Sequence, residues 1–155
     1  MASDHCGHVC LKNRMREEIL LDLYKNSELD AIDRKTHEST YHLEFWKKVY
    51  DKYVDLLINS GILNNNFIDI GSGDGRFLKY CKDNTQLNLY ANDYCSDNYD
   101  YIVDLVGKDS YYYKQTLDDI DFGNKKFGII TLWGMLEHLP KPKNVMKLWK
   151  VILNY

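Results

Sequence analysis

The sequence predicts an α/β fold with a parallel sheet and flanking helices. Short apolar runs alternate along the chain with stretches of helical spacing. A glycine-rich turn directly follows the first clear apolar run, and an acidic residue ends the next one. Strands that alternate with helices form parallel sheets with right-handed crossovers. We therefore expect one domain built around one sheet.

The composition excludes several classes of protein. Of the 155 residues, 45% are hydrophobic, which is enough apolar material for one globular core. The formal net charge is −3 with both signs scattered along the chain, so the charge pattern of a nucleic-acid or anionic-membrane binder is absent. No apolar run approaches the roughly 20 residues that cross a bilayer, and the N-terminus is too polar for a signal peptide. We expect a cytoplasmic protein with a small-molecule substrate and no nucleic-acid or membrane partner.

An amphipathic helix is predicted over residues 41–59. Its apolar residues recur at helical spacing, with lysines and acids between them; they are Trp46, Val49, Tyr50, Tyr53, Val54 and Leu57. Gly61 is expected to end this helix. A shorter helix is predicted over residues 17–24, followed by a turn. We assign residues 1–40 to an N-terminal extension and residues 41–155 to the main domain.

The predicted strands follow the long helix. Residues 67–70 (FIDI) form a nearly continuous apolar run, as expected of a parallel strand that is buried on both faces. Residues 76–81 return to helical spacing. Further strands are predicted over residues 87–93, 111–116 and 126–133, and the middle one has the weakest pattern. A last helical stripe consists of Val145, Leu148, Trp149 and Ile152.

The segment DIGSGDG between the first strand and the next helix predicts a cofactor loop. Gly71, Gly73 and Gly75 stand at alternate positions, so the backbone can approach a ligand with no side chain in the way. Asp69 and Ser72 lie in the same segment and are included in the predicted site. The alternative is a glycine-rich turn in an unrelated fold. The order of strand, loop, helix, strand and acid favours the cofactor loop.

The spacing of the motif also indicates which cofactor it suits. A dinucleotide fingerprint, GxGxxG, would place its third glycine where Arg76 stands, which disfavours NAD and FAD. Asp93 ends the next strand, where a carboxylate can accept hydrogen bonds from both ribose hydroxyls of an adenosine group. An adenosine cofactor without a pyrophosphate fits both features.

These motifs resemble those of the class I S-adenosylmethionine-dependent methyltransferases, whose first motif is a strand-borne acid followed by GxGxG. Asp69, Gly71, Gly73 and Gly75 stand in those positions, and the resemblance assigns Asp93 to the ribose hydroxyls. The chain is similar to the methyltransferase type 11/12/23 group, which includes the ubiquinone-biosynthesis O-methyltransferases, above all in the segment FGIITLWGMLEHLPKP. The resemblance implies a Rossmann-like fold and S-adenosyl-L-methionine as the cofactor.

The resemblance also implies two further parts of the cofactor site. In the family, the loop after the third strand flanks the adenine, and the matching positions are Thr116, Leu117 and Asp118, although an acid is common where Thr116 stands. The segment after the fourth strand lines the methyl-transfer site, which would bring Trp133 and Met135 close to the sulfonium. For Trp133, a packing role is the alternative.

A catalytic base is suggested in the same segment. His138 is the candidate general base there. A loop-to-helix junction, held together by hydrogen bonds of Glu137 and His138, is the alternative. Quinone-pathway members carry a further glutamate three residues before this pair, which allows a divalent cation to bind. Gly134 occupies that place here, so we expect no metal.

The N-terminal segment DHCGHVC, residues 4–10, resembles the tail of a zinc ribbon that precedes the methyltransferase domain in some enzymes. Ser3 stands where the first cysteine of the ribbon pattern CxxCG belongs. The side chains that would have to bind zinc crowd too closely for a tetrahedral site; they are His5, Cys6, His8 and Cys10. We expect no zinc site there, and no disulfide among the four cysteines of the chain, Cys6, Cys10, Cys81 and Cys95.

Members of the family continue through three more strands, whereas this chain ends at Tyr155. We therefore expect the C-terminal strands to be missing and residues 41–155 to form a partial S-adenosylmethionine-binding domain. The strand over residues 126–133 would then be an exposed edge that favours self-association or a partner chain.

Three function hypotheses follow from these patterns. The first is methyl transfer from S-adenosylmethionine to a small-molecule or protein acceptor. The second is a non-catalytic cofactor-binding fragment or regulatory module that needs a partner chain. The third is a nicotinamide oxidoreductase, because that class shares the fold. Binding of S-adenosylhomocysteine but not of NAD would eliminate the third.

Overall fold

The computed structural model describes residues 16, 18–19, 22, 40–59, 61, 65–94, 98–117, 119–136 and 139. The short helix predicted over residues 17–24 is described at Glu18, Ile19 and Asp22, all of which are helical. The predicted zinc-ribbon resemblance at residues 4–10 and the predicted stripe over residues 145–152 lie outside the described residues.

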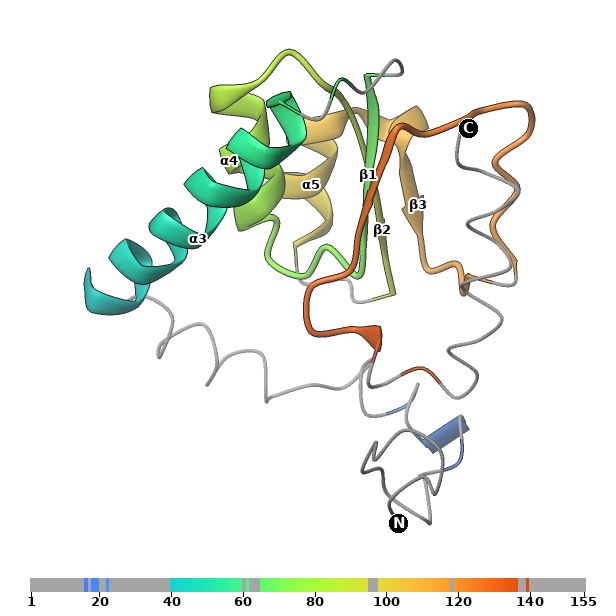
Figure 1. Ribbon diagram of the computed structural model, residues 1–155. Coiled ribbons are helices and arrows are strands. Elements are labelled where there is room, and N and C mark those ends of the chain that lie inside the picture. Colours follow the sequence, from blue (N-terminus) through green and yellow to red (C-terminus); the bar gives the residue numbers. More distant parts are fainter. Residues whose placement is uncertain are drawn as a thin grey trace, which may run out of the picture.

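A sheet of four parallel strands, in the order β3-β2-β1-β4, is the centre of the fold (Figure 1). The strands are β1 (Asn66–Ile70), β2 (Asn88–Asp93), β3 (Tyr111–Tyr113) and β4 (Ile129–Thr131). The chain moves from β1 outward to β2 and β3, and β4 then pairs with the other side of β1. This arrangement confirms the predicted α/β class with its parallel sheet.

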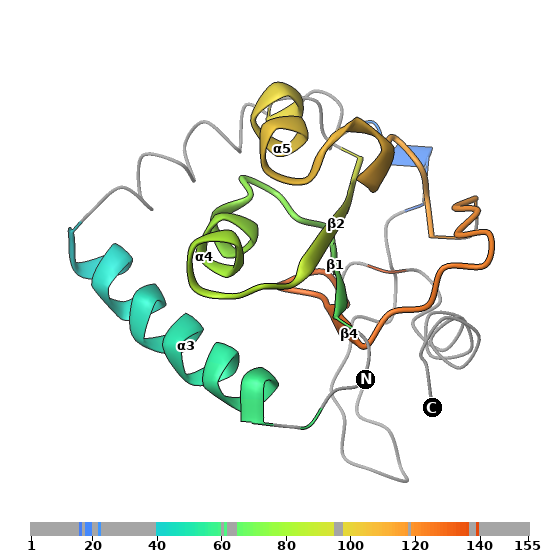
Figure 2. The same ribbon diagram turned by 90° about the horizontal axis from the view of Figure 1, so that it is seen from above.

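Helices cover one face of this sheet. They are α3 (Thr40–Asn59), α4 (Arg76–Asn84) and α5 (Tyr99–Val106), and a 3₁₀ turn, η1 (Lys108–Ser110), leads into β3. In Figure 2, α4 lies between α3 and β1, and α5 lies beside β2. None of the helices within the described ranges is long and apolar enough to cross a membrane.

The hydrophobic core has two parts, one on each face of β1. Phe67 points toward the helices, whereas Ile68 and Ile70 point toward the opposite face. All three side chains are fully buried, as the apolar run had predicted. The segment that leads from β3 to β4 covers the opposite face; its buried apolar residues are Leu117, Ile120, Phe122 and Phe127.

Most predicted elements are present, with different bounds. The helix predicted over residues 76–81 continues to Asn84. The strand predicted over residues 126–133 is shorter, because only Ile129–Thr131 pair with β1 as a strand. The strand predicted over residues 111–116 ends at Tyr113, because Lys114 has a φ of 55°, which lies outside the extended region of the backbone. Helix α5 was not predicted.

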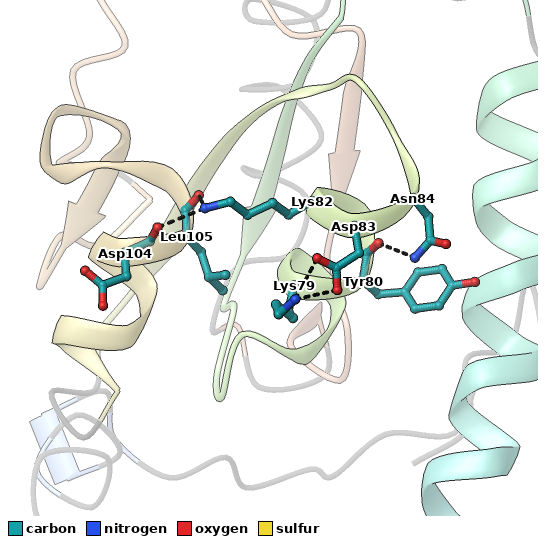
Figure 3. Close-up of polar contacts among 7 residues, drawn as sticks. All are labelled: Lys79, Tyr80, Lys82, Asp83, Asn84, Asp104 and Leu105. Carbon is teal, nitrogen blue, oxygen red and sulfur yellow. Dashed lines mark hydrogen bonds and ion pairs between the residues drawn. The ribbon is translucent and has the colours of Figure 1, made fainter.

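Polar contacts attach α4 to both neighbouring helices. The ammonium group of Lys82 donates to the backbone oxygens of Asp104 and Leu105, each at 2.9 Å, and so caps the end of α5 (Figure 3). The hydroxyl of Tyr80 donates to the carboxylate of Asp51 in α3. These contacts fix α4, whose first residue follows the glycine-rich turn.

Candidate functional site

The candidate site lies at the carboxyl ends of β1, β2 and β4. The strand order changes direction at β1, since β2 lies on one side of it and β4 on the other. In open α/β sheets, ligands bind outside the carboxyl ends of the strands at this kind of switch point. The glycine loop, residues 71–75, follows β1 at this place, and residues 133–135 follow β4.

Hydrogen bonds to the end of β2 hold the glycine loop. The N–H groups of Gly71 and Ser72 donate to the backbone oxygen of Asn92 at 2.8 and 3.0 Å. The N–H of Gly73 donates to Oδ2 of Asp93 at 2.7 Å. The two motifs that the sequence singled out, the glycine turn and the acid at the end of β2, are therefore in direct contact.

The three glycines of the loop are needed for different structural reasons. All have positive φ, at 69° for Gly71, 55° for Gly73 and 73° for Gly75, which favours glycine at each position. A Cβ atom at Gly71 would lie 2.6 Å from the sulfur of Met135, and one at Gly75 would lie 2.4 Å from Cδ1 of Ile102. A Cβ at Gly73 would meet no atom of the described residues within 4 Å. Of the three glycines, only Gly73 therefore borders space that the described part of the chain leaves open to a ligand.

Ser72 and Asp93 bring polar groups to this loop. Asp93 is 9% exposed and Ser72 is 8% exposed. The Ser72 hydroxyl has no hydrogen-bond partner among the described residues, which is uncommon for a buried polar group and leaves it available to a ligand or to water. The donor and acceptor chemistry at the loop fits an adenosine ligand.

Asp69 lies deeper, on the helix-covered face of β1. It is 2% exposed, and its Oδ1 accepts a hydrogen bond of 2.7 Å from the hydroxyl of Thr131 in β4. Burial raises the pKa of Asp69 to about 7; the Thr131 hydrogen bond opposes this shift, and the charge of Asp93 adds to it. Asp69 can therefore exchange a proton near neutral pH.

Two other titratable groups near Asp69 are held in their neutral forms. Burial, and then the charges of Asp74 and Asp69, raise the pKa of the Tyr50 hydroxyl to about 12. Burial and the charge of Asp69 raise the pKa of the Cys81 thiol to about 12. Cys81 is therefore a packing residue rather than a nucleophile at neutral pH.

Trp133 packs into a cluster of aromatic rings from α3 and α4. Its ring centroid lies 5.0 Å from that of Phe77 and 5.1 Å from that of Tyr53, both in edge-to-face geometry. The indole nitrogen is buried and has no hydrogen-bond partner in the part of the chain that the structure describes. The packing role that was the alternative for Trp133 is thus present, and its predicted contact with the sulfonium stays a prediction.

Residues 114–117, which follow β3, contain Thr116 and Leu117, the positions predicted to flank the adenine base of the cofactor. We call this segment the base-side loop. Leu117 is buried in the core on the opposite face of the sheet, and the Thr116 hydroxyl donates to Asp119 at 2.5 Å. The N–H of Lys114 donates to the backbone oxygen of Asp93 at 2.9 Å. The glycine loop and the base-side loop are therefore both bonded to the end of β2.

Some site residues lie outside the described residues, and others were not predicted. The residues outside the described part of the chain are Asp118, Glu137 and His138, so their predicted roles stay predictions. The residues that the sequence did not predict are Thr131 and Asn92. No clear signal in the sequence singles out Asn92, because the same strand has a second asparagine, Asn88, at its start.

A comparison with known protein families gives a match over most of the chain. The family model described as a methyltransferase domain matches residues 41–154. No curated protein and no solved structure matches the chain. The matched range spans the whole described sheet and the candidate site.

Proposed function

Because the chain belongs to the methyltransferase domain family and has the Rossmann-like fold of its class I members, we propose that it binds S-adenosyl-L-methionine and transfers the methyl group to a small-molecule or protein acceptor. The contact between Gly73 and Asp93 carries this proposal. It joins a backbone that a ligand can approach to a carboxylate that can bind ribose hydroxyls.

The residues of the site suit the parts of this cofactor. Asp93 would accept hydrogen bonds from the ribose hydroxyls, and the backbone at Gly73 would face the ligand without a side chain between them. The Ser72 hydroxyl offers a buried donor that lacks a protein partner in the described ranges. Thr116 and Leu117 would border the adenine. The cofactor supplies an activated methyl group on a sulfonium.

The chain's own contribution to methyl transfer would be mainly positioning and exclusion of water. Trp133 and Met135 follow β4 at the carboxyl end of the sheet, and Met135 lies against Gly71. Apolar side chains there would keep water from the reacting atoms. His138 remains the candidate base that would take a proton from the acceptor.

Calorimetry with S-adenosylhomocysteine and with NAD tests the cofactor assignment. Binding of the first and not of the second is expected, because the loop has Arg76 where a dinucleotide site has its third glycine. Binding of NAD alone would overturn the proposal in favour of an oxidoreductase.

A transfer assay tests the second half of the proposal. S-adenosylmethionine with a labelled methyl group is incubated with the protein and with separate small-molecule and protein fractions. Label in an acceptor fraction is expected. Cofactor binding without transfer to either fraction would favour the non-catalytic binding module.

A further inference from the structure

The side chain of Asn92 joins the end of β3 to the start of the base-side loop. Its amide nitrogen donates to the backbone oxygen of Tyr112 at 2.7 Å and to that of Gln115 at 2.9 Å. Asn92 is buried, since only 3% of the residue is exposed. These bonds span Lys114, whose backbone has a φ of 55°.

The backbone of Asn92 serves the other loop. Its carbonyl oxygen accepts the N–H groups of Gly71 and Ser72 at 2.8 and 3.0 Å. One residue at the end of β2 therefore contacts the glycine loop with its main chain and the base-side loop with its side chain. Loops that contact the same ligand need a fixed separation, and a shared rigid strand provides one.

The uncharged amide of asparagine suits this buried bridge. Two backbone carbonyls converge on one group, so that group must present two N–H donors and no negative charge. An aspartate would place acceptors against acceptors in a buried position, and an apolar residue would leave two buried carbonyls without these donors. The backbone of Lys114 disfavours the turn, because a non-glycine residue at positive φ is strained. The two hydrogen bonds from Asn92 therefore help to hold the turn in place.

We propose that Asn92 is a positioning residue that sets the base-side loop, and thereby the selectivity of the site for the base of its ligand. The proposal rests on the proposed function, since it takes the ligand to be an adenosyl compound. Asn92 acts through Tyr112 and Gln115 and touches no reacting atom.

Two variants and a matched control test this role in the full chain. Asn92→Ser keeps one donor in a small side chain, and Asn92→Asp removes both donors from a side chain of the same shape. Asn88→Asp is the control, because it makes the same change on the same strand at its exposed opposite end, where the amide of Asn88 donates to Asn66 at 3.1 Å.

Calorimetry compares S-adenosylhomocysteine with its analogue in which hypoxanthine replaces adenine. Wild-type protein is expected to prefer adenine, and Asn92→Ser should reduce this preference about fivefold, which corresponds to the loss of one hydrogen bond. A fold defect alone lowers both affinities by the same factor and leaves their ratio unchanged. Asn88→Asp should leave the ratio as in the wild type.

Hydrogen exchange on the unliganded variants gives a second readout. The amides of residues 114–119 should exchange faster in both Asn92 variants, while those of β1 keep their rates. An unchanged base preference, equal wild-type affinity for the two bases, or uniformly faster exchange would overturn the positioning role. Wild-type protein that binds neither ligand would overturn the proposed function instead, and the positioning of the loop would then be judged from exchange alone.

Discussion

The carboxylate of Asp93 accepts a hydrogen bond of 2.7 Å from the backbone N–H of Gly73. This bond between two parts of the chain orders the glycine loop, and Gly73 faces space that the described residues leave open. It also fixes the carboxylate at the position where ribose hydroxyls are expected. Preorganisation of this kind lowers the entropy that a ligand must lose on binding.

The three glycines should differ in their response to alanine. In Gly73→Ala the new Cβ meets no atom of the described residues within 4 Å, so the free energy of unfolding should fall only by the strain of a positive φ, roughly 1–2 kcal/mol. Affinity for S-adenosylhomocysteine should fall by tenfold or more, because the methyl group occupies the ligand's space. Calorimetry and thermal unfolding on the same samples measure the two effects.

Gly75→Ala is the matched comparison. Its Cβ would lie 2.4 Å from Cδ1 of the buried Ile102, so the strain of the backbone is joined by an overpacking cost of about 1–3 kcal/mol. Stability should fall more than in Gly73→Ala. Wild-type affinity in Gly73→Ala would show that the ligand does not approach the loop there.

Asp93→Ala should weaken binding of S-adenosylhomocysteine by about 1–3 kcal/mol, because charge-assisted hydrogen bonds to the ribose are lost in a nearly buried site. The affinity of Asp93→Asn should lie between those of this variant and the wild type, since an amide oxygen can still accept the hydrogen bond from the N–H of Gly73. Asp109→Ala removes an exposed carboxylate in η1 and serves as the control. Equal affinities for Asp93→Ala and wild type would assign this acid a purely structural role.

Stability should decrease as pH rises through the titration of Asp69. Its pKa is about 7 in the folded chain, against 3.8 for the model carboxyl. Between these values the folded state holds a proton that the unfolded state has released, so stability from this group is full below about pH 4 and is lost as the pH approaches 7. The integrated effect amounts to about 4 kcal/mol. Urea unfolding from pH 4.5 to 8 measures it.

Two substitutions check that Asp69 is the source. Asp69→Asn should flatten this part of the stability profile, because the amide does not titrate. The hydroxyl of Thr131 donates to Asp69 and thereby lowers the pKa of this carboxyl. Thr131→Val removes the hydroxyl and should raise the pKa, so the decline in stability should extend to higher pH. A profile that is the same in all three proteins would assign the pH dependence to other groups.

Lys82→Met should destabilise the chain by about 0.5–1.5 kcal/mol. The substitution keeps the apolar stem but removes the donor to the backbone oxygens of Asp104 and Leu105 at the end of α5. Lys79→Met is the control, because it removes only an exposed pair with Asp83 in the same helix, worth about 0.3–0.5 kcal/mol. Equal losses in the two variants, measured by urea unfolding, would contradict the capping role.

The parts of the fold that the sequence predicts well are those with a strong local pattern. Residues 67–70 are buried on both faces of the sheet, and a continuous apolar run predicts that directly. The placement of the glycine turn and Asp93 at the ends of neighbouring strands follows from the order of strand, turn, helix and strand. Both depend on rules that apply within a short window of the chain.

Helix α5 was missed because its local pattern is ambiguous. The residues Ile102, Val103, Leu105 and Val106 nearly form a continuous apolar run, which fits a short strand as well as a helix. The acids Asp100 and Asp104, one turn apart, and Gly107 after the last residue were the helical signals. In the structure only Ile102 of this run is fully buried.

The partners of Asp69 and Asn92 depend on pairings between distant strands. Thr131 lies 62 residues from Asp69 along the chain, and no local pattern connects them. The bridge from Asn92 likewise requires the register of β2 with β3, which places Asn92 beside Tyr112. Strand order and register, rather than residue type, determine these contacts.

The position of β1 also determines when the site can be completed during translation. During translation, β1, β2 and β3 emerge from the ribosome before β4. These three strands are neighbours in the sheet, so they can pair with one another before β4 is synthesised. The other edge of β1 stays open until β4 is synthesised, and Asp69 lacks the Thr131 hydroxyl throughout that interval. Nascent chains halted before residue 129 would therefore present an open β1 edge to chaperones, whereas those released after β4 would not.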